Sequence, residues 1–332
     1  MQVETTKSVP QQQAGSSRGR VLAAVWEDMG MLILYAVLFV VASLFVPYFF
    51  TVRNMIGLSL SVSQVGMLAC TMLFCLAAAD VDLSIGSMIA FSGVLNAVLM
   101  QLMPGQIVVP VVISLLAALL GGLFNGYVVA NLGVNALIAT LATMQIFRGL
   151  GFRLSHGVAV GIANDQFYLL GNGTLLGIPL PIWVTAACFV VYGFLLNRTV
   201  YGRNTLAIGG NKEAARLSGI NVELTRMVIF GLQGLMAGVA GVILSSRITS
   251  GQPNAALGSE LDVISACVLG GVSLSGGIGT ITGTVAGVLI MGTVQNILSL
   301  RNVEYFWQYV VRGAVLLVAV LIDQLKQRRA AG

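Results

Sequence analysis

No side chain between Leu83 and Phe147 carries a formal charge, and similar apolar runs fill most of the remaining chain. A helix that crosses a bilayer needs about 20 apolar residues, so this stretch alone has room for three crossings. Of the 332 residues, 57% are hydrophobic and 9% are charged. Water-soluble domains carry roughly 25% charged residues. The sequence therefore predicts an all-α polytopic membrane protein without a separate soluble domain.

The apolar runs predict about ten transmembrane helices, some of them short or broken. The expected crossings are 30–50, 55–79, 84–103, 107–130, 134–153, 176–196, 227–246, an interrupted stretch within 251–277, 278–298 and 306–322. The expected domains are an N-terminal tail (1–29), a transmembrane domain (30–323) that contains a charged loop (197–225), and a C-terminal tail (324–332). Forty glycines predict close helix packing, because small residues let helices approach one another in lipid.

The basic residues predict the orientation, since Lys and Arg concentrate in short cytoplasmic loops. With both termini in the cytoplasm, eleven basic residues lie inside and five lie outside. The inside set is Lys7, Arg18, Arg20, Arg198, Arg203, Lys212, Arg216, Arg226, Lys326, Arg328 and Arg329, and the outside set is Arg53, Arg148, Arg153, Arg247 and Arg301. We therefore expect a multi-pass protein with both termini and the loop 197–225 in the cytoplasm.

The cysteines and the single histidine predict no metal or cofactor site in this chain. All four cysteines lie in apolar runs and lack the spacing of a metal-binding pair. They are Cys70, Cys75, Cys188 and Cys267. One histidine, His156, cannot by itself build a metal centre or a catalytic triad. We also expect no enzymatic activity, because no catalytic constellation lies at membrane depth.

The charged loop contains a short helix signal between Gly209 and Ile220. Asn211 can cap a helix over Lys212–Leu217, and Gly219 can end it. A helix of about two turns is marginal in water and needs support from a partner or from the membrane domain. On charge alone, a basic loop that only fixes topology remains an equally valid interpretation.

The order of residues in this loop resembles a known motif. Glu213, Ala214 and Ala215, followed after three residues by Gly219, are similar to the "EAA…G" loop in membrane subunits of ATP-binding-cassette (ABC) importers. In that family the loop forms a coupling helix that docks into the cytoplasmic ATPase. The resemblance implies that the coupling residues are Lys212, Glu213, Ala214, Ala215, Arg216 and Gly219.

Further motifs resemble the ribose-type sugar permeases among these importers. Residues 80–87 (DVDLSIGS) are similar to "DLSVG", and residues 139–150 (ATLATMQIFRGL) to "ATLGTM…RGL". Residues 260–264 (ELDVI) and 269–279 (LGGVSLSGGIG) resemble "ELDAIAA…LGGTSLSGGxG". The resemblance extends from about residue 30 to the C terminus. One departure is Ala78-Ala79, where the family usually has two glycines.

Two of these motifs also resemble each other and predict an internal repeat. Residues 81–84 (VDLS) match residues 272–275 (VSLS), and each enters a glycine-containing segment. Transporters often place broken helices from two repeats around a midplane pathway. The sequence leaves open whether the halves are inverted or parallel.

Several polar residues at membrane depth are candidates for the transport pathway. Intramembrane acids are costly and therefore functional or tightly paired. Both a pathway role and a helix-capping role stay open for Asp80, Asp82, Glu260 and Asp262. Neutral polyols need amides and hydroxyls, and interhelical hydrogen bonding is the competing role for such groups. These candidates are Ser84, Asn96, Asn125, Asn135, Thr140, Thr143 and Gln145.

The chain contains no Gly directly followed by Lys and therefore no phosphate-binding P-loop. The resemblance implies that ATP and Mg²⁺ bind a separate cytoplasmic ATPase subunit. It also implies a periplasmic sugar-binding protein that selects the cargo. Because ATPase modules come in pairs and the chain has one coupling helix, we expect a homodimer. Apart from the lipid bilayer, we expect no further partner, and no nucleic acid.

The combined prediction is the permease subunit of a bacterial inner-membrane ABC importer that works by alternating access. Its expected cargo is a pentose, with L-arabinose favoured over ribose, xylose or another small cargo. An ion-coupled secondary transporter is the alternative class, and such a protein would transport in vesicles without any partner.

Overall fold

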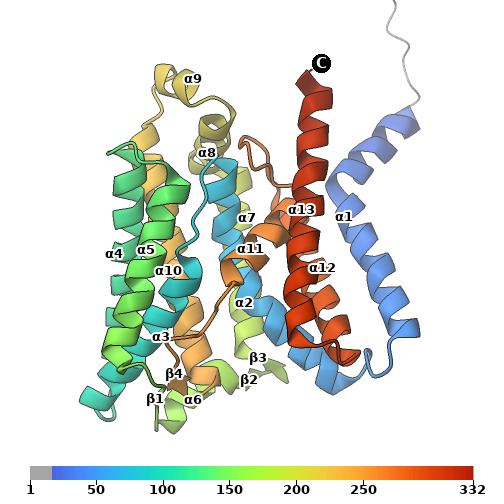
Figure 1. Ribbon diagram of the computed structural model, residues 1–332. Coiled ribbons are helices and arrows are strands. Elements are labelled where there is room, and N and C mark those ends of the chain that lie inside the picture. The colour runs from blue at the N-terminus through green and yellow to red at the C-terminus, as the bar shows by residue number, and fades with distance from the viewer. Residues whose placement is uncertain (1–16, 332) are drawn as a thin grey trace, which may run out of the picture.

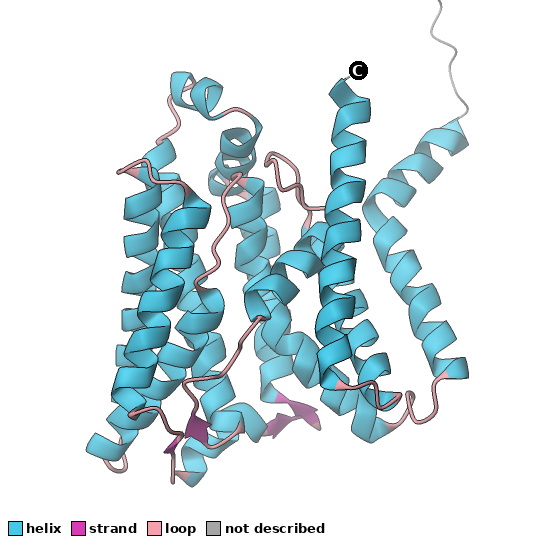
Figure 2. Ribbon diagram, viewed as in Figure 1, coloured by secondary structure: helices cyan, strands magenta, loops and turns pink. Residues whose placement is uncertain are grey.

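The computed structural model describes residues 17–331, and the predicted tail up to residue 16 lies outside the described residues. The chain is a bundle of helices with two small antiparallel strand pairs (Figure 2). The helices are α1 (Ser17–Phe45), α2 (Val52–Ala77), α3 (Ile85–Leu102), α4 (Val108–Ala130), α5 (Ala136–Ser155), α6 (Asp165–Asn172), α7 (Leu180–Arg198), α8 (Val200–Gly210), α9 (Lys212–Leu217), α10 (Val222–Arg247), α11 (Ser259–Leu269), α12 (Ile281–Leu300) and α13 (Tyr305–Ala331).

The four strands are β1 (Val160–Gly161), β2 (Thr174–Leu175), β3 (Ile178–Pro179) and β4 (Ser250–Gly251). β1 pairs with β4, and β2 pairs with β3, both antiparallel. These strands lie at one end of the bundle, which we call the strand end, together with α6 (Figure 1). At the opposite end, which we call the α9 end, lie α8, α9 and the C-terminal end of α13 (Figure 1).

The all-α polytopic fold is confirmed. Six described helices, α2, α3, α4, α7, α10 and α12, are long and apolar enough to cross a membrane, and two shorter apolar segments lie at Gly30–Phe45 and Phe306–Leu321. The predicted fifth crossing is α5, which carries Arg148 and Arg153. The predicted eighth is α11, whose 11 residues rise only about 16 Å, roughly half of a 30 Å hydrocarbon core.

Helices extend further than hydropathy predicts. α1 begins at Ser17 and α13 continues to Ala331, so both predicted tail boundaries fall within helices. The charged loop 197–225 is itself mostly helical, because α8 fills its first part and α10 already begins at Val222. The physical reason is that a helix needs apolar side chains only where it contacts lipid. Asn221, whose side chain accepts from the Leu224 amide at 2.9 Å, is the capping signal that marks the true start of α10.

The core centres on α10, which packs against α4, α3 and α2. Glycines make the closest contact possible. A Cβ at Gly122 on α4 would overlap the Phe230 carbonyl oxygen, and a Cβ at Gly234 on α10 would overlap the Ala118 carbonyl oxygen. The close packing expected from the glycine content is therefore present between these two helices. The shorter helices α8, α9 and α11 lie outside this tight contact between α4 and α10.

Candidate functional site

The predicted short helix in the charged loop is α9, and its bounds match the predicted bounds of Lys212–Leu217. The Asn211 side chain accepts from the Ala214 amide at 2.9 Å, which caps the helix. Gly219 follows with a φ of 82°, a left-handed conformation that favours glycine. Ala215 is buried in a small cluster with Ile208 and Val222. This cluster supplies the tertiary support that a two-turn helix requires.

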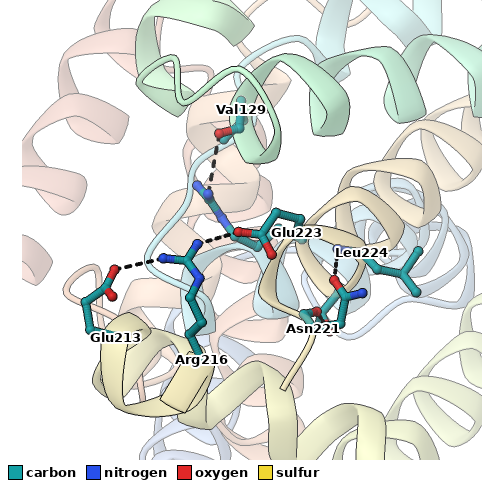
Figure 3. A network of polar contacts seen from close by, with 8 residues as sticks. Val129, Glu213, Arg216, Asn221, Glu223 and Leu224 are labelled. Atoms are coloured by element: carbon teal, nitrogen blue, oxygen red, sulfur yellow. Dashed lines mark hydrogen bonds and ion pairs between the residues drawn. The ribbon is translucent and has the colours of Figure 1, made fainter. Parts of the chain in front are cut away.

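A charged network fixes α9 to the start of α10, as Figure 3 shows. Arg216 donates to Glu213 at 3.0 Å and also forms an ion pair with Glu223. These hydrogen bonds and charges raise the pKa of the Arg216 guanidinium. Because all three groups are exposed, the pairs orient α9 more than they stabilise it.

The tip of α9 presents an apolar side chain to its surroundings. Leu217 is 89% exposed, the largest exposed fraction among the large hydrophobic residues of the described chain. The residue lies beside the charged side chains of Glu213 and Arg216 on a helix that protrudes from the bundle (Figure 1). Exposed apolar groups rimmed by charges mark protein contact sites. α9 therefore has the composition of a docking surface.

A buried ion pair lies directly beneath this surface. Arg226 on α10 donates to both carboxylate oxygens of Asp80, from Nε at 2.7 Å and from Nη2 at 2.6 Å. Its Nη1 also approaches the Val129 carbonyl oxygen at 3.4 Å (Figure 3). The count of basic residues assigned Arg226 to the cytoplasmic side, next to the charged loop. In the structure its side chain is buried inside the bundle. The pair neutralises two charges that would be costly alone.

A polar cavity of about 330 Å³ opens beside the ion pair. Asp80, Arg226, Lys212 and the candidate residue Asn135 line it. Partial burial, followed by the nearby positive charge of Arg226, lowers the pKa of the Lys212 ammonium. Asn135 also caps α5 by accepting from the Leu137 amide at 2.9 Å. One predicted coupling residue, Lys212, and two pathway candidates, Asp80 and Asn135, thus line a single polar space.

Three chain segments meet by backbone contact next to this cavity. The Gly277 amide donates to the Ala77 carbonyl at 2.9 Å, which joins the segment after α11 to the end of α2. Gly209 on α8 packs against both, since a Cβ there would overlap the Ala77 oxygen. Gly276 packs against Gly209 and Ala79. We call Ala77, Gly209 and Gly277, with their neighbours, the glycine junction.

The two helices that end near the junction end in the same way, as the predicted repeat requires. After α2, Ala79 is left-handed with a φ of 60°, and the Asp80 amide donates to Cys75 O at 2.9 Å. After α11, Gly271 has a φ of 88°, and the Val272 amide donates to Cys267 O at 3.0 Å. Both endings are Schellman motifs.

The turns that follow these helix ends also match. The Ser84 amide donates to Asp82 Oδ1 at 2.9 Å, and the Ser275 amide donates to Ser273 Oγ at 3.2 Å. The segment after α2 has one more residue between the left-handed residue and this turn, since Ala79 precedes Asp82 by three positions and Gly271 precedes Ser273 by two. The four-residue sequence match thus corresponds to a shared local geometry, although the orientation of the halves is a separate matter.

Asp82 anchors a buried hydrogen-bond chain between α3 and α4. The Ser84 hydroxyl donates to Asp82 at 2.6 Å and accepts from the Asn125 amide at 2.9 Å. Thr140 and Thr143 on α5 donate to carbonyls of their own helix, to Ala136 at 2.8 Å and to Thr140 at 3.3 Å, and the Thr140 hydroxyl also lies 3.4 Å from the Val81 carbonyl oxygen. The structure therefore joins Asp82, Ser84 and Asn125 in one network and leaves the threonines outside it.

The acids of α11 form a separate group. Asp262 forms an ion pair with Arg312 on α13 at 3.2 Å and accepts from Gln295 on α12 at 3.1 Å. The Glu260 carboxylate lies against Gly86 on α3, where a Cβ would overlap it. Sequence reasoning missed Arg312. A lone arginine in the last apolar run, opposite in sign to an intramembrane acid, was the available signal.

These features define a polytopic membrane permease with a polar cluster at one end of the bundle. The chain belongs to the family described as "Branched-chain amino acid transport system / permease component", which matches residues 54–320. Its relatives include the L-arabinose transport system permease protein AraH of Escherichia coli, 55% identical over 304 residues and 92% of each chain.

Two further relatives extend the comparison. The L-arabinose ABC transporter permease protein AraH of Azospirillum brasilense is 48% identical over 99% of this chain and 98% of its own length. The ribose import permease protein RbsC of Bacillus subtilis is 41% identical over 91% and 94%. No solved structure matches the chain. The predicted class, a permease of an ABC sugar importer, is confirmed.

Proposed function

We propose that this chain is the membrane-spanning permease subunit of an importer that carries L-arabinose from the periplasm into the cytoplasm of a bacterium by alternating access. Both termini face the cytoplasm, a cytoplasmic ATPase supplies the energy, a periplasmic binding protein delivers the sugar, and two copies of the chain form the transport pathway. The observation that carries the proposal is α9, a supported helix that exposes Leu217. The preceding helix α8 contacts the end of α2 and the segment after α11 through Gly209.

The proposed mechanism begins at α9. Leu217, Glu213 and Arg216 dock on the ATPase, and the ion pair of Arg216 with Glu223 keeps α9 aligned with α10. Closure of the ATPase pair on ATP displaces α9 and the adjoining α8. Because Gly209 contacts Ala77 and Gly277 without intervening side chains, a displacement of α8 also displaces the end of α2 and the segment that follows α11.

The chain itself contributes no ATP chemistry to this cycle. ATP and Mg²⁺ bind on the partner ATPase, since the sequence contains no Gly-Lys pair from which a P-loop could be built. The permease supplies docking, coupling and a passage. Orientation of the α9 end toward the cytoplasm is supported by the excess of basic residues in the loops of that side.

Ribose is the second candidate cargo. The ribose import permease proteins RbsC of three bacteria are 38% to 41% identical to this chain, below the 55% of the L-arabinose permease protein. Uptake of labelled L-arabinose and labelled ribose by cells that carry or lack this chain separates the two. Loss of ribose uptake with normal L-arabinose uptake would overturn the proposed cargo.

The coupling role is tested by Leu217→Asp, with Leu176→Asp as its matched control. Leu176 is 84% exposed in the β2–β3 turn at the strand end. We expect Leu217→Asp to abolish copurification with the ATPase and sugar uptake, because the charge removes the apolar contact. Leu176→Asp should copurify with the ATPase normally. Equal copurification of both variants would contradict docking through α9.

A further inference from the structure

A second polar cavity, of about 450 Å³, lies in the half of the bundle nearer the strand end. Its lining comes from five helices, α2, α10, α11, α12 and α13, and from the segment 254–257, and includes Ser61, Gln64, Asp262, Gln295, Tyr309 and Arg312. Ser61 and Gln64 are in the first half of α2, Gln295 is near the end of α12 and Tyr309 is near the start of α13. These parts of the helices converge at the strand end (Figure 1).

The chemistry of this lining is unlike that of a lipid-facing surface. Asp262, Arg312 and Gln295 form one ion-paired and hydrogen-bonded group at membrane depth. Charged and amide side chains in a membrane protein face a water-filled cavity or another part of the protein. The cavity is open rather than sealed, so its polar groups have room for water or for a ligand.

The group is suited to a ligand that both donates and accepts hydrogen bonds. Asp262 and Arg312 offset each other in charge, and Gln295 and Gln64 add amide donors and acceptors. Within residues 17–331, Arg312 Nε is buried and has no hydrogen-bond partner. The Tyr309 ring lies 5.5 Å from the Arg312 guanidinium and adds an aromatic face. Carboxylate, guanidinium and amide groups beside one aromatic ring suit a ligand that carries several hydroxyls.

We propose that this cavity binds a pentose in transit, through hydrogen bonds from the sugar hydroxyls to Asp262, Arg312 and Gln295 and packing of the sugar ring against Tyr309. This inference rests on the proposed function and adds to it a site in the membrane domain itself. Because the cavity is at the strand end, opposite α9, it receives sugar from the side where the binding protein releases it. Arg247 also reaches the cavity, so an anionic sugar acid is the competing ligand.

The test measures thiol labelling in the complete transporter with its ATPase and binding protein in proteoliposomes. Ser61→Cys introduces a thiol into the cavity, and Leu116→Cys introduces one on α4, where Leu116 is exposed and apolar. A charged methanethiosulfonate reagent reacts with the thiolate and therefore reports contact with water. The parent protein gives the background, since Cys70, Cys75 and Cys267 are buried and Cys188 is partly buried.

We expect Ser61→Cys to label about tenfold faster than Leu116→Cys, because only the former lies in a wetted cavity. Saturating L-arabinose should then slow labelling of Ser61→Cys and leave Leu116→Cys unchanged. Asn254→Cys, at another edge of the same cavity, gives the same measurement if Ser61→Cys does not assemble. Equal labelling of cavity and control thiols, or protection by L-arabinonate but not by L-arabinose, overturns the proposal.

Uptake of labelled L-arabinose by the parent transporter, measured in the same vesicles, separates the two levels of inference. If the parent imports L-arabinose but the sugar leaves labelling at Ser61→Cys and Asn254→Cys unchanged, the cavity proposal fails alone. If the parent imports no L-arabinose, the proposed cargo fails and the cavity proposal falls with it.

Discussion

Arg226 on α10 and Asp80 at the end of α2, 146 positions apart in the chain, form two parallel hydrogen bonds of 2.6 Å and 2.7 Å inside the bundle. The pair joins the start of α10, which follows α9, to the segment that follows α2. It therefore lies on the route by which motion of the α9 end would reach the membrane domain.

Removal of either partner should destabilise the protein strongly. Asp80→Ala leaves the Arg226 guanidinium buried and unpaired, and Arg226→Ala leaves the carboxylate unpaired, at a cost of about 3–5 kcal/mol each. The double variant Asp80→Leu, Arg226→Met should recover much of this loss, since no lone charge remains. Thermal midpoints in detergent measure the effect. A double variant as unstable as the sum of the two single variants would contradict a charge-pairing role.

The glycine junction predicts a sharp contrast between two neighbouring glycines. Gly209→Ala places a methyl group into the Ala77 carbonyl and must separate α8 from α2, whereas Gly210→Ala meets no atom within 4 Å. We expect Gly209→Ala to abolish uptake and Gly210→Ala to retain it. ATPase activity of the assembled transporter, measured with and without the loaded binding protein, shows whether coupling or assembly was lost. Similar behaviour of the two variants would refute the junction.

Ala79 holds a conformation that suits glycine better. Its φ of 60° puts an L residue in the left-handed region, and the matching position after α11 is Gly271. Ala79→Gly relieves this strain and should stabilise the protein by about 1 kcal/mol. Ala78→Gly, at a residue with a φ of −87°, relieves nothing and serves as the control. A lower thermal midpoint for Ala79→Gly than for the parent would show that the alanine methyl contact with Gly276 outweighs the strain.

Loss of the α9 cap should loosen the docking helix selectively. Asn211→Ala removes the acceptor for the Ala214 amide, which costs about 1 kcal/mol, while Asn211→Ser retains a capping oxygen. Hydrogen exchange at the α9 amides should accelerate about fivefold in Asn211→Ala and little in Asn211→Ser. Exchange in α10 serves as the internal reference. Unchanged exchange in Asn211→Ala would mean that the buried Ala215 cluster alone holds α9.

Signals within a few residues of one another predicted local structure well. The cap and stop residues Asn211 and Gly219 fixed the bounds of α9, because both act within one helical turn. The crossings followed from apolar length, yet α8 and the start of α10 were assigned to a loop because hydropathy reports contact with lipid and not helix formation.

Relationships between distant residues were not accessible in the same way. The partners of Asp80 and Asp262, Arg226 and Arg312, come from other helices, and no spacing rule connects them. The contacts of the acids differ from residue to residue, and their pathway role stays a prediction. Asp82 accepts from the next turn, whereas Asp80 and Asp262 are ion-paired.

Contacts made only of main-chain atoms have a consequence for how such a protein can change over time. At a side-chain interface, a larger residue on one helix can be offset by a smaller one on its neighbour. Gly209 faces the carbonyl of Ala77 and the amide of Gly277, which every amino acid except proline also possesses. No second substitution can restore that space. We therefore expect position 209 to remain glycine among relatives, and paired-substitution methods to find no covariation there.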